Sequence, residues 1–214
     1  MRFRDRRDAG RQLAALITAS SLHDPIVLAL PRGGVPVAFE VAAALGAPLE
    51  VLVARKIGAP RQPELGIGAV AEGGARVVDH DLARHLGLSE ADIDLLAEGA
   101  LAELERRVQA YRGDRGLPPL AGRHVIVVDD GVATGGTAEA ALAAVRARHA
   151  ARVVLAVPVC SPDSSRRLAR VADEVVSVLT PADLTAVGQW YQDFTQTTDA
   201  EVRDLLEAAA RREL

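Results

Sequence analysis

An apolar run that ends in two adjacent carboxylates is the feature of this sequence that most restricts its fold. Residues 125–128 are four consecutive β-branched residues, Asp129 and Asp130 follow directly, and the loop GVATGGT leads into an alanine-rich segment. A short continuous apolar run is typical of a strand buried on both faces, and alanine favours a helix. We therefore predict a strand, a polar loop and a helix start.

The rest of the chain alternates between strand-like and helix-like segments. Short apolar runs predict strands at residues 26–30, 49–54, 152–159 and 174–178. Apolar residues at helical spacing predict helices at residues 5–19, 35–45, 89–111, 162–171 and from 199 onward. Parallel strands need helical crossovers, so this order predicts an α/β fold: a mostly parallel sheet with helices on both faces.

The segment KIGAPRQPELGIGAVAEGG separates two of these units. Its glycines and prolines predict a long loop over residues 56–78, with a short hairpin at 67–78. The whole chain, residues 1–214, is long enough for one large domain and too short for two full ones. We therefore expect a single domain in which the long loop at residues 56–78 has a functional role.

Composition excludes several classes of protein. The 25 Lys plus Arg against 29 Asp plus Glu give a net charge of −4, so binding to nucleic acid is not expected. The single cysteine, Cys160, allows no intramolecular disulfide. Charged residues interrupt every apolar stretch before the roughly 18 residues that a membrane span needs, and no signal-peptide pattern opens the chain. We expect a cytoplasmic protein without membrane contact.

The loop GVATGGT has the composition of an anion site. Gly131, Gly135 and Gly136 allow successive backbone amides to point at one anion from the amino end of a helix. The hydroxyls of Thr134 and Thr137 would add donors to the same oxygens. This pattern predicts a site for a phosphate monoester.

The acid pair indicates what is attached to that phosphate. Asp129 and Asp130 would repel a phosphate placed beside them, so they should face neutral hydroxyls, as of a sugar diol, or a metal ion. A nucleotide-hydrolysing P-loop is excluded because Thr137 stands where a lysine is required, and no glycine triplet of the dinucleotide type follows a predicted strand. A plain tight turn would explain one or two of the glycines only. We predict a sugar phosphate as ligand.

At this point the residues match a known family. The segment VIVVDDGVATGGT closely resembles the phosphoribosyl pyrophosphate signature of type I phosphoribosyltransferases. PRGG at residues 31–34 resembles the pyrophosphate loop of that family, and RKIGAP at residues 55–60 resembles the start of its flexible catalytic loop. The chain is also similar to a group of bacterial phosphoribosyltransferases without an assigned substrate. The resemblance implies a type I phosphoribosyltransferase fold with a small hood, for which residues 181–198 are the candidate.

The resemblance implies roles for individual residues. Asp129 and Asp130 would bind the ribose hydroxyls, and the amides and hydroxyls of residues 133–137 would bind the 5-phosphate. Arg32 and Gly33, in a loop whose peptide is often cis in this family, would contact pyrophosphate. The implied substrate-binding residues are Arg32, Gly33, Gly34, Arg55, Lys56, Asp129, Asp130, Ala133, Thr134, Gly135, Gly136, Thr137 and Trp190, of which Arg32, Lys56, Asp129 and Asp130 would be catalytic. The alternative for Arg32, Arg55 and Lys56 is that they are solvated surface charges.

The expected chemistry depends on charge. Substitution at the anomeric carbon passes through a cation-like ribosyl centre while pyrophosphate leaves with growing negative charge. The site therefore needs cationic donors and Mg²⁺, which the oxygens of the substrate pyrophosphate and ribose would mainly hold. The five histidines show no metal-ligand spacing, and we predict no protein metal site. The substrates implied are phosphoribosyl pyrophosphate and a small nitrogenous acceptor.

Of the two implied substrates, the acceptor is the one that the sequence defines least. Ala133 stands where enzymes for hypoxanthine and guanine have an aspartate, which counts against those bases. The segment VGQWYQDFT contains Trp190, Tyr191 and Phe194, which would stack on a planar acceptor or form an aromatic plug behind the last helix. The helix at residues 89–111 would pack outside the sheet or on a second subunit of a homodimer. A binding module without turnover and a hydrolase that uses water remain alternatives.

Overall fold

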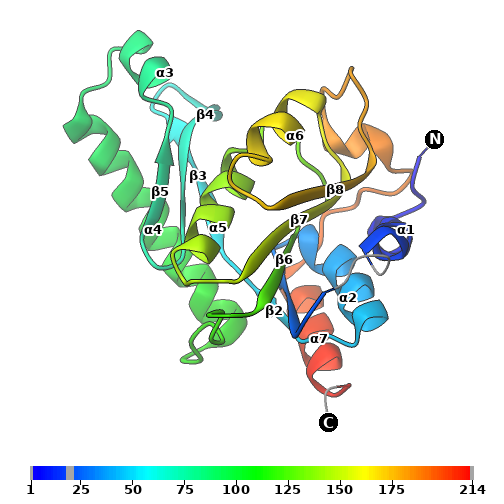
Figure 1. The fold of residues 1–214 in the computed structure, drawn as a ribbon. Coiled ribbons are helices and arrows are strands. Elements are labelled where there is room, and N and C mark those ends of the chain that lie inside the picture. Colours follow the sequence, from blue (N-terminus) through cyan, green and yellow to red (C-terminus); the bar gives the residue numbers. More distant parts are fainter. Residues whose placement is uncertain (1, 18–21, 213–214) are drawn as a thin grey trace.

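The computed structural model describes residues 2–17 and 22–212, with a five-stranded parallel sheet at its centre (Figure 1). The strand order is β2-β1-β6-β7-β8, and every neighbouring pair is parallel. The strands of this sheet are β1 (Pro25–Ala29), β2 (Leu49–Val51), β6 (His124–Val128), β7 (Arg152–Val159) and β8 (Glu174–Leu179). The predicted parallel sheet is confirmed.

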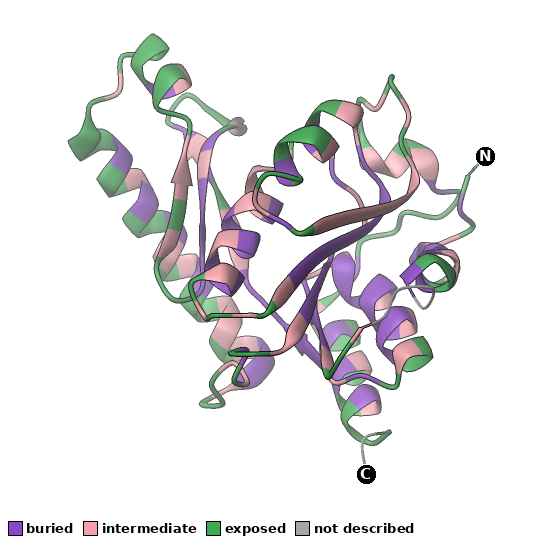
Figure 2. Ribbon diagram, viewed as in Figure 1, coloured by how far each residue is buried: buried purple, intermediate pink, exposed green. Residues whose placement is uncertain are grey.

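Helices cover both faces of this sheet, as predicted. Alternate residues of each strand belong to two hydrophobic cores, because successive side chains of a strand point to opposite faces. Helices α1 (Arg6–Ile17), α2 (Gly34–Leu45) and α7 (Asp199–Ala210) cover one face. Helices α5 (Gly136–Arg146) and α6 (Pro162–Leu168) cover the other. Strands β1, β2, β6 and β7 are almost entirely buried, whereas the edge strand β8 is half-buried along its length (Figure 2).

The segment that we predicted as a long loop over residues 56–78 is instead a second sheet. Its three antiparallel strands are β3 (Ala54–Ala59), β4 (Gln62–Ala71) and β5 (Ala75–Val78). Gly58 and Gly68 lie where another backbone passes closely: a β-carbon at Gly68 would lie 2.4 Å from the carbonyl oxygen of Val77. The loop prediction was wrong because glycine here permits close strand pairing rather than irregular backbone. The hairpin predicted at 67–78 corresponds to the paired β4 and β5.

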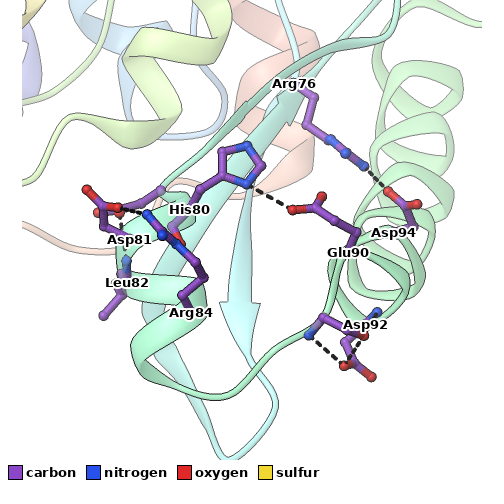
Figure 3. Close-up of polar contacts among 10 residues, drawn as sticks. Arg76, His80, Asp81, Leu82, Arg84, Glu90, Asp92 and Asp94 are labelled. Atoms are coloured by element: carbon purple, nitrogen blue, oxygen red, sulfur yellow. Dashed lines mark hydrogen bonds and ion pairs between the residues drawn. The ribbon is translucent and has the colours of Figure 1, made fainter.

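This second sheet lies between α5 and the long helix α4 (Glu90–Arg112), to which the short α3 (His80–His85) leads (Figure 1). Helix α4 begins with a capping box, in which Ser89 and Asp92 bond to each other's backbone amides. Two exposed contacts join these elements: Nδ1 of His80 in α3 lies 3.3 Å from the Glu90 carboxylate of α4, and Arg76 of β5 pairs with Asp94 of α4 (Figure 3). Buried Arg112, at the end of α4, pairs with Glu72 and bonds to the Val51 carbonyl.

The chain between β8 and α7 contains a short 3₁₀ helix, η1 (Val187–Trp190), and otherwise irregular backbone. This segment returns to the N-terminus, because Phe3 forms an isolated bridge with Tyr191. Among the described helices, none combines the length and the apolar composition that a bilayer crossing requires.

Candidate active site

The two glycines after β1 pack directly against the acid pair after β6. The two loops meet because β1 and β6 are adjacent parallel strands that end at the same edge. A β-carbon at Gly34 would lie 2.7 Å from the carbonyl oxygen of Val128, and one at Gly33 would lie 1.9 Å from Oδ2 of Asp130. Only glycine therefore lets this loop approach the carboxylates so closely.

Arg6 binds the acid pair from α1, and sequence reasoning did not find it. Its Nε donates to Oδ2 of Asp130 at 2.8 Å, and its Nη1 donates to the carbonyl of Thr195 at 2.7 Å. Its guanidinium also lies 3.9 Å from the ring centroid of Phe194. The side chain is only 10% exposed. In the sequence Arg6 is one of four arginines in the first ten residues, so nothing distinguishes it there.

The charge state of the acid pair is set by burial and by Arg6. Burial raises the pKa of Asp129 well above its ordinary value, and the adjacent Asp130 carboxylate raises it further. Burial also raises the pKa of Asp130, against the opposing positive charge of Arg6. Arg6 is therefore the group that favours the ionised form of Asp130.

The carbonyl groups of the loop after the acid pair face α6. The carbonyl of Ala133 accepts hydrogen bonds from the hydroxyls of Ser161, at 2.9 Å, and Ser164, at 2.7 Å. The carbonyl of Thr134 accepts from Arg167. These three side chains fix the loop with its acceptors turned toward α6.

The amide groups of the same loop are left without such partners. Gly135 has the positive φ of 77° that turns the chain into α5, as its sequence position suggested. Within the described residues, the amides of residues 133–137 donate to no acceptor of the chain. Unpaired amides at the amino end of a helix favour an anion. This geometry fits the predicted phosphate site, with Thr137 in the first turn.

A cleft of about 660 Å³ opens beside this loop. Its lining includes Arg55, Lys56 and Thr137, which the sequence analysis predicted to share one site. It also includes Pro31, from the loop after β1. The remaining wall is apolar or comes from α4, and comprises Ala54, Ile57, Gly58, Ala59, Pro60, Pro63, Leu96, Gly99, Ala100 and Arg107. Helix α4 is thus a wall of the cleft, a position that neither of our two sequence-based alternatives for it described.

Lys56 lies on strand β3, paired with Ala69 of β4, rather than on a loop as we predicted. Its aliphatic stem crosses Gly66, where a β-carbon would lie 2.9 Å from Cδ of the lysine. The missing side chain at Gly66 therefore makes room for Lys56 on the cleft side of the small sheet.

Glu103 of α4 holds the arginines of the cleft wall. Its carboxylate accepts from Nε of Arg107 at 3.1 Å, from Nε of Arg106 at 2.7 Å, and lies 3.7 Å from Nη1 of Arg55. The hydrogen bonds from Arg106 and Arg107 lower the pKa of Glu103 to about 2. Glu103 consequently stays ionised at neutral pH and keeps Arg55 and Arg107 in place.

Of the predicted site residues, Arg55, Lys56 and Thr137 line the cleft, and the others lie outside its lining: Arg32, Gly33, Gly34, Asp129, Asp130, Ala133, Thr134, Gly135, Gly136 and Trp190. The peptide between Pro31 and Arg32 is cis, as expected for this loop. The proposed contacts of Arg32 and Trp190 with substrate stay predictions.

The aromatic residues near the C-terminus form a cluster with the N-terminus. The ring of Tyr191 lies 5.4 Å from that of Phe3 and 4.9 Å from that of Phe194, and Trp190 is partly buried beside them. The hydroxyl of Tyr191 donates to the Asp130 carbonyl at 2.5 Å. The cluster therefore packs on the N-terminal segment rather than on the last helix, and it borders the acid pair.

The donor set suits a metal ion that the substrate brings. Among the described residues, no three His, Cys, Asp or Glu side chains converge as a metal cage would require. Arg6 already occupies Oδ2 of Asp130. Mg²⁺ commonly keeps few protein ligands and takes phosphate oxygens and water instead, so these residues fit an ion held by the substrate.

Comparison with known proteins identifies the family. The sequence model of the phosphoribosyl transferase domain matches residues 4–189. The chain belongs to the phosphoribosyltransferase family. In two strains of Mycobacterium tuberculosis, a protein named "Putative phosphoribosyl transferase" is 52% identical over 209 residues, which are 98% of this chain and 47% of that protein. The chain thus spans about half the length of the curated relatives it matches.

Two solved structures support the fold of this phosphoribosyltransferase. Protein TT1426 of Thermus thermophilus has a TM-score of 0.82 and 46% identity, covering 96% of this chain and 98% of its own. Protein AQ2163 of Aquifex aeolicus has a TM-score of 0.53 at 14% identity, covering 95% and 85%, and is similar in fold alone. The predicted fold class and family are confirmed.

Proposed function

We propose that this phosphoribosyltransferase uses phosphoribosyl pyrophosphate with Mg²⁺, transfers the 5-phosphoribosyl group to a small nitrogenous acceptor and releases pyrophosphate. The observation that carries the proposal is the cleft itself. Thr137, from a loop with unpaired amides, faces the same 660 Å³ as the cations Arg55, Lys56 and Arg107. Two separate sets of anion donors on one cleft suit a ligand with phosphate at two positions.

Each part of the chain then has a task. The amides of residues 133–137 and the hydroxyl of Thr137 bind the 5-phosphate, which fixes one end of the ribose. Asp129 and Asp130 accept hydrogen bonds from the ribose hydroxyls. Lys56, with Arg55 and Arg107, stabilises the negative charge that grows on pyrophosphate as the bond to the anomeric carbon breaks. No covalent nucleophile is needed, because the fixed sugar and the cations lower the barrier.

The Mg²⁺ ion would be bound through pyrophosphate and ribose oxygens, and it would withdraw charge from the leaving group. Arg55, Lys56 and Arg107 would add to that effect from the protein side. The pyrophosphate contacts of Arg32 and Gly33 belong to the same proposal, with Gly33 and Gly34 allowing the loop to reach the acid pair.

The acceptor is proposed only as a class. Ala133 leaves no carboxylate at the position where one would act on a hypoxanthine or guanine ring, so we expect other nitrogenous acceptors. Two alternatives keep the same ligand: a hydrolase in which water is the acceptor, and a binding module without turnover. Cations that line the cleft beside the phosphate loop favour chemistry on the leaving group over binding alone.

The test is pyrophosphate release from phosphoribosyl pyrophosphate and Mg²⁺ with a panel of nitrogenous bases, and with no base at all. Release that depends on one base supports a transferase and names its acceptor. Equal release without a base indicates the hydrolase. Saturable binding without release under any condition indicates the binding module.

A further inference from the structure

Arg6 joins three segments that are far apart in the sequence. It lies in the first turn of α1, its Nε binds the Asp130 carboxylate after β6, and its Nη1 binds the Thr195 carbonyl before α7. Its guanidinium also stacks over the ring of Phe194. The Arg6 side chain is 10% exposed and contacts two segments besides its own helix, so its position is fixed. A fixed guanidinium also restricts the positions of the groups that it binds.

The position of Asp130 depends on this contact. Its carboxylate lies in the space that the missing side chain of Gly33 leaves, and the β-carbon position of that glycine is 3.1 Å from Nε of Arg6. Arg6 holds Oδ2, and the Tyr191 hydroxyl holds the Asp130 carbonyl. Arg6 thus engages Oδ2 and not Oδ1 of the Asp130 carboxylate.

We propose that Arg6 is a positioning residue for phosphoribosyl transfer, which orients the Asp130 carboxylate toward the ribose and couples it to the segment of Phe194 and Thr195. This inference rests on the proposed function, since it gives Arg6 its effect through a ribose-binding carboxylate. Arg6 itself is not expected to contact the substrate.

Three features distinguish this role from ordinary packing. The guanidinium donates from two different nitrogens to two partners, which a lysine ammonium can imitate only in part. The ion pair is partly buried, so its loss leaves Asp130 without a counter-charge. One of the two partners of Arg6 is Asp130, the carboxylate proposed to bind the ribose. Removing Arg6 should therefore impair ligand binding beyond any loss of stability.

The experiment is a double-mutant cycle on the affinity for phosphoribosyl pyrophosphate with Mg²⁺. The proteins are wild type, Arg6→Gln, Asp130→Asn and the double variant, and Arg6→Lys tests rescue. Arg7→Gln is the matched control, because Arg7 neighbours Arg6 on α1 and pairs with Glu40 on an exposed face. Melting temperatures of all variants show that each protein is folded.

We expect Arg6→Gln to weaken affinity about tenfold, the size of one lost charge-assisted bond of about 1.4 kcal/mol. The double variant should bind no worse than Asp130→Asn, because Arg6 acts through that carboxylate. Arg6→Lys should recover part of the loss, and Arg7→Gln should bind like wild type.

Additive losses in the double variant, or wild-type affinity in folded Arg6→Gln, would overturn the inference. If Arg6→Gln does not fold, the cycle is run with Arg6→Lys, where additivity has the same meaning. A wild-type protein that binds no phosphoribosyl pyrophosphate would instead overturn the proposed function. The carboxyl ¹³C shift of Asp130 still tests the Arg6 contact in that case, since it should differ between wild type and Arg6→Gln without any ligand.

Discussion

The α-carbon of Gly33 faces the carboxylate of Asp130 so closely that an added β-carbon would lie 1.9 Å from Oδ2. The backbone of Gly33 is helical, with φ of −61° and ψ of −31°, so any residue could adopt it. Space, and not backbone freedom, therefore requires glycine at this position. The loop that contains Gly33 and the acid pair therefore form one packed unit.

This contact predicts the effect of Gly33→Ala. The new methyl group should displace the Asp130 carboxylate and break its bond to Arg6, so affinity for phosphoribosyl pyrophosphate should fall at least about tenfold. Calorimetric titration measures the change. Gly116→Ala is the control, because a β-carbon at Gly116 meets no atom within 4 Å. Wild-type affinity in Gly33→Ala would show that the acid pair does not bind the ligand.

Lys56 provides a test of catalysis against binding. Its ammonium should matter more as charge builds on the departing pyrophosphate than in the resting complex, so Lys56→Ala should slow turnover more than it weakens binding. Single-turnover pyrophosphate release at saturating ligand gives the rate. Arg61→Ala, an exposed cation beyond the end of the same strand, should release pyrophosphate like wild type. Equal rates for Lys56→Ala and wild type would reject the catalytic role.

A comparison of Arg107 with Arg106 tests whether α4 forms a wall of the binding site. Both donate to Glu103, but only Arg107 lines the cleft. Arg107→Gln should weaken binding of phosphoribosyl pyrophosphate about tenfold and leave ribose 5-phosphate binding nearly unchanged, because only the first ligand carries pyrophosphate. Arg106→Gln should change neither. Competition binding with both ligands measures this, and equal losses for the two arginine variants would contradict the assignment of α4 as a wall of the site.

Tyr111 predicts a pH dependence of stability. Its hydroxyl donates to Asp199 at 2.6 Å and joins α4 to α7. Burial and this bond raise the pKa of Tyr111 to about 12, from 10.0. The contribution of the neutral phenol is complete below pH 10 and is lost as pH rises from 10 to 12. Urea unfolding should show wild type losing stability over that interval relative to Tyr111→Phe. Parallel pH profiles for the two proteins would refute this prediction.

The sequence predicted the parts of the fold that local pattern determines. Buried strands such as residues 125–128 can be recognised by continuous apolar runs, and apolar residues at helical spacing predicted the helix that corresponds to α4. The small sheet was missed because its glycines and prolines are typical of loops, and only the antiparallel pairing of neighbouring segments within residues 54–78 makes them strands.

The candidate site likewise contains residues that the sequence identified and residues that it did not. The phosphate loop is contiguous in sequence, so its motif could be recognised. Arg6 and Asp130 are 124 positions apart, and their contact depends on how α1 packs on the sheet. Arg107 faces the cleft only because the small sheet sets α4 beside it. Such residues have no local signal, since their neighbours are set by tertiary packing.

The measurement that tests the central claim most directly is a calorimetric titration of the protein with phosphoribosyl pyrophosphate and Mg²⁺, repeated with Thr137→Ala. We expect saturable binding of one ligand per chain, and affinity at least about tenfold weaker in the variant because a donor to the 5-phosphate is lost. At a hundredfold excess over the dissociation constant, the ligand should also stabilise the wild-type fold by about 2.7 kcal/mol. Absence of both heat and stabilisation at millimolar ligand would contradict the assignment of this cleft.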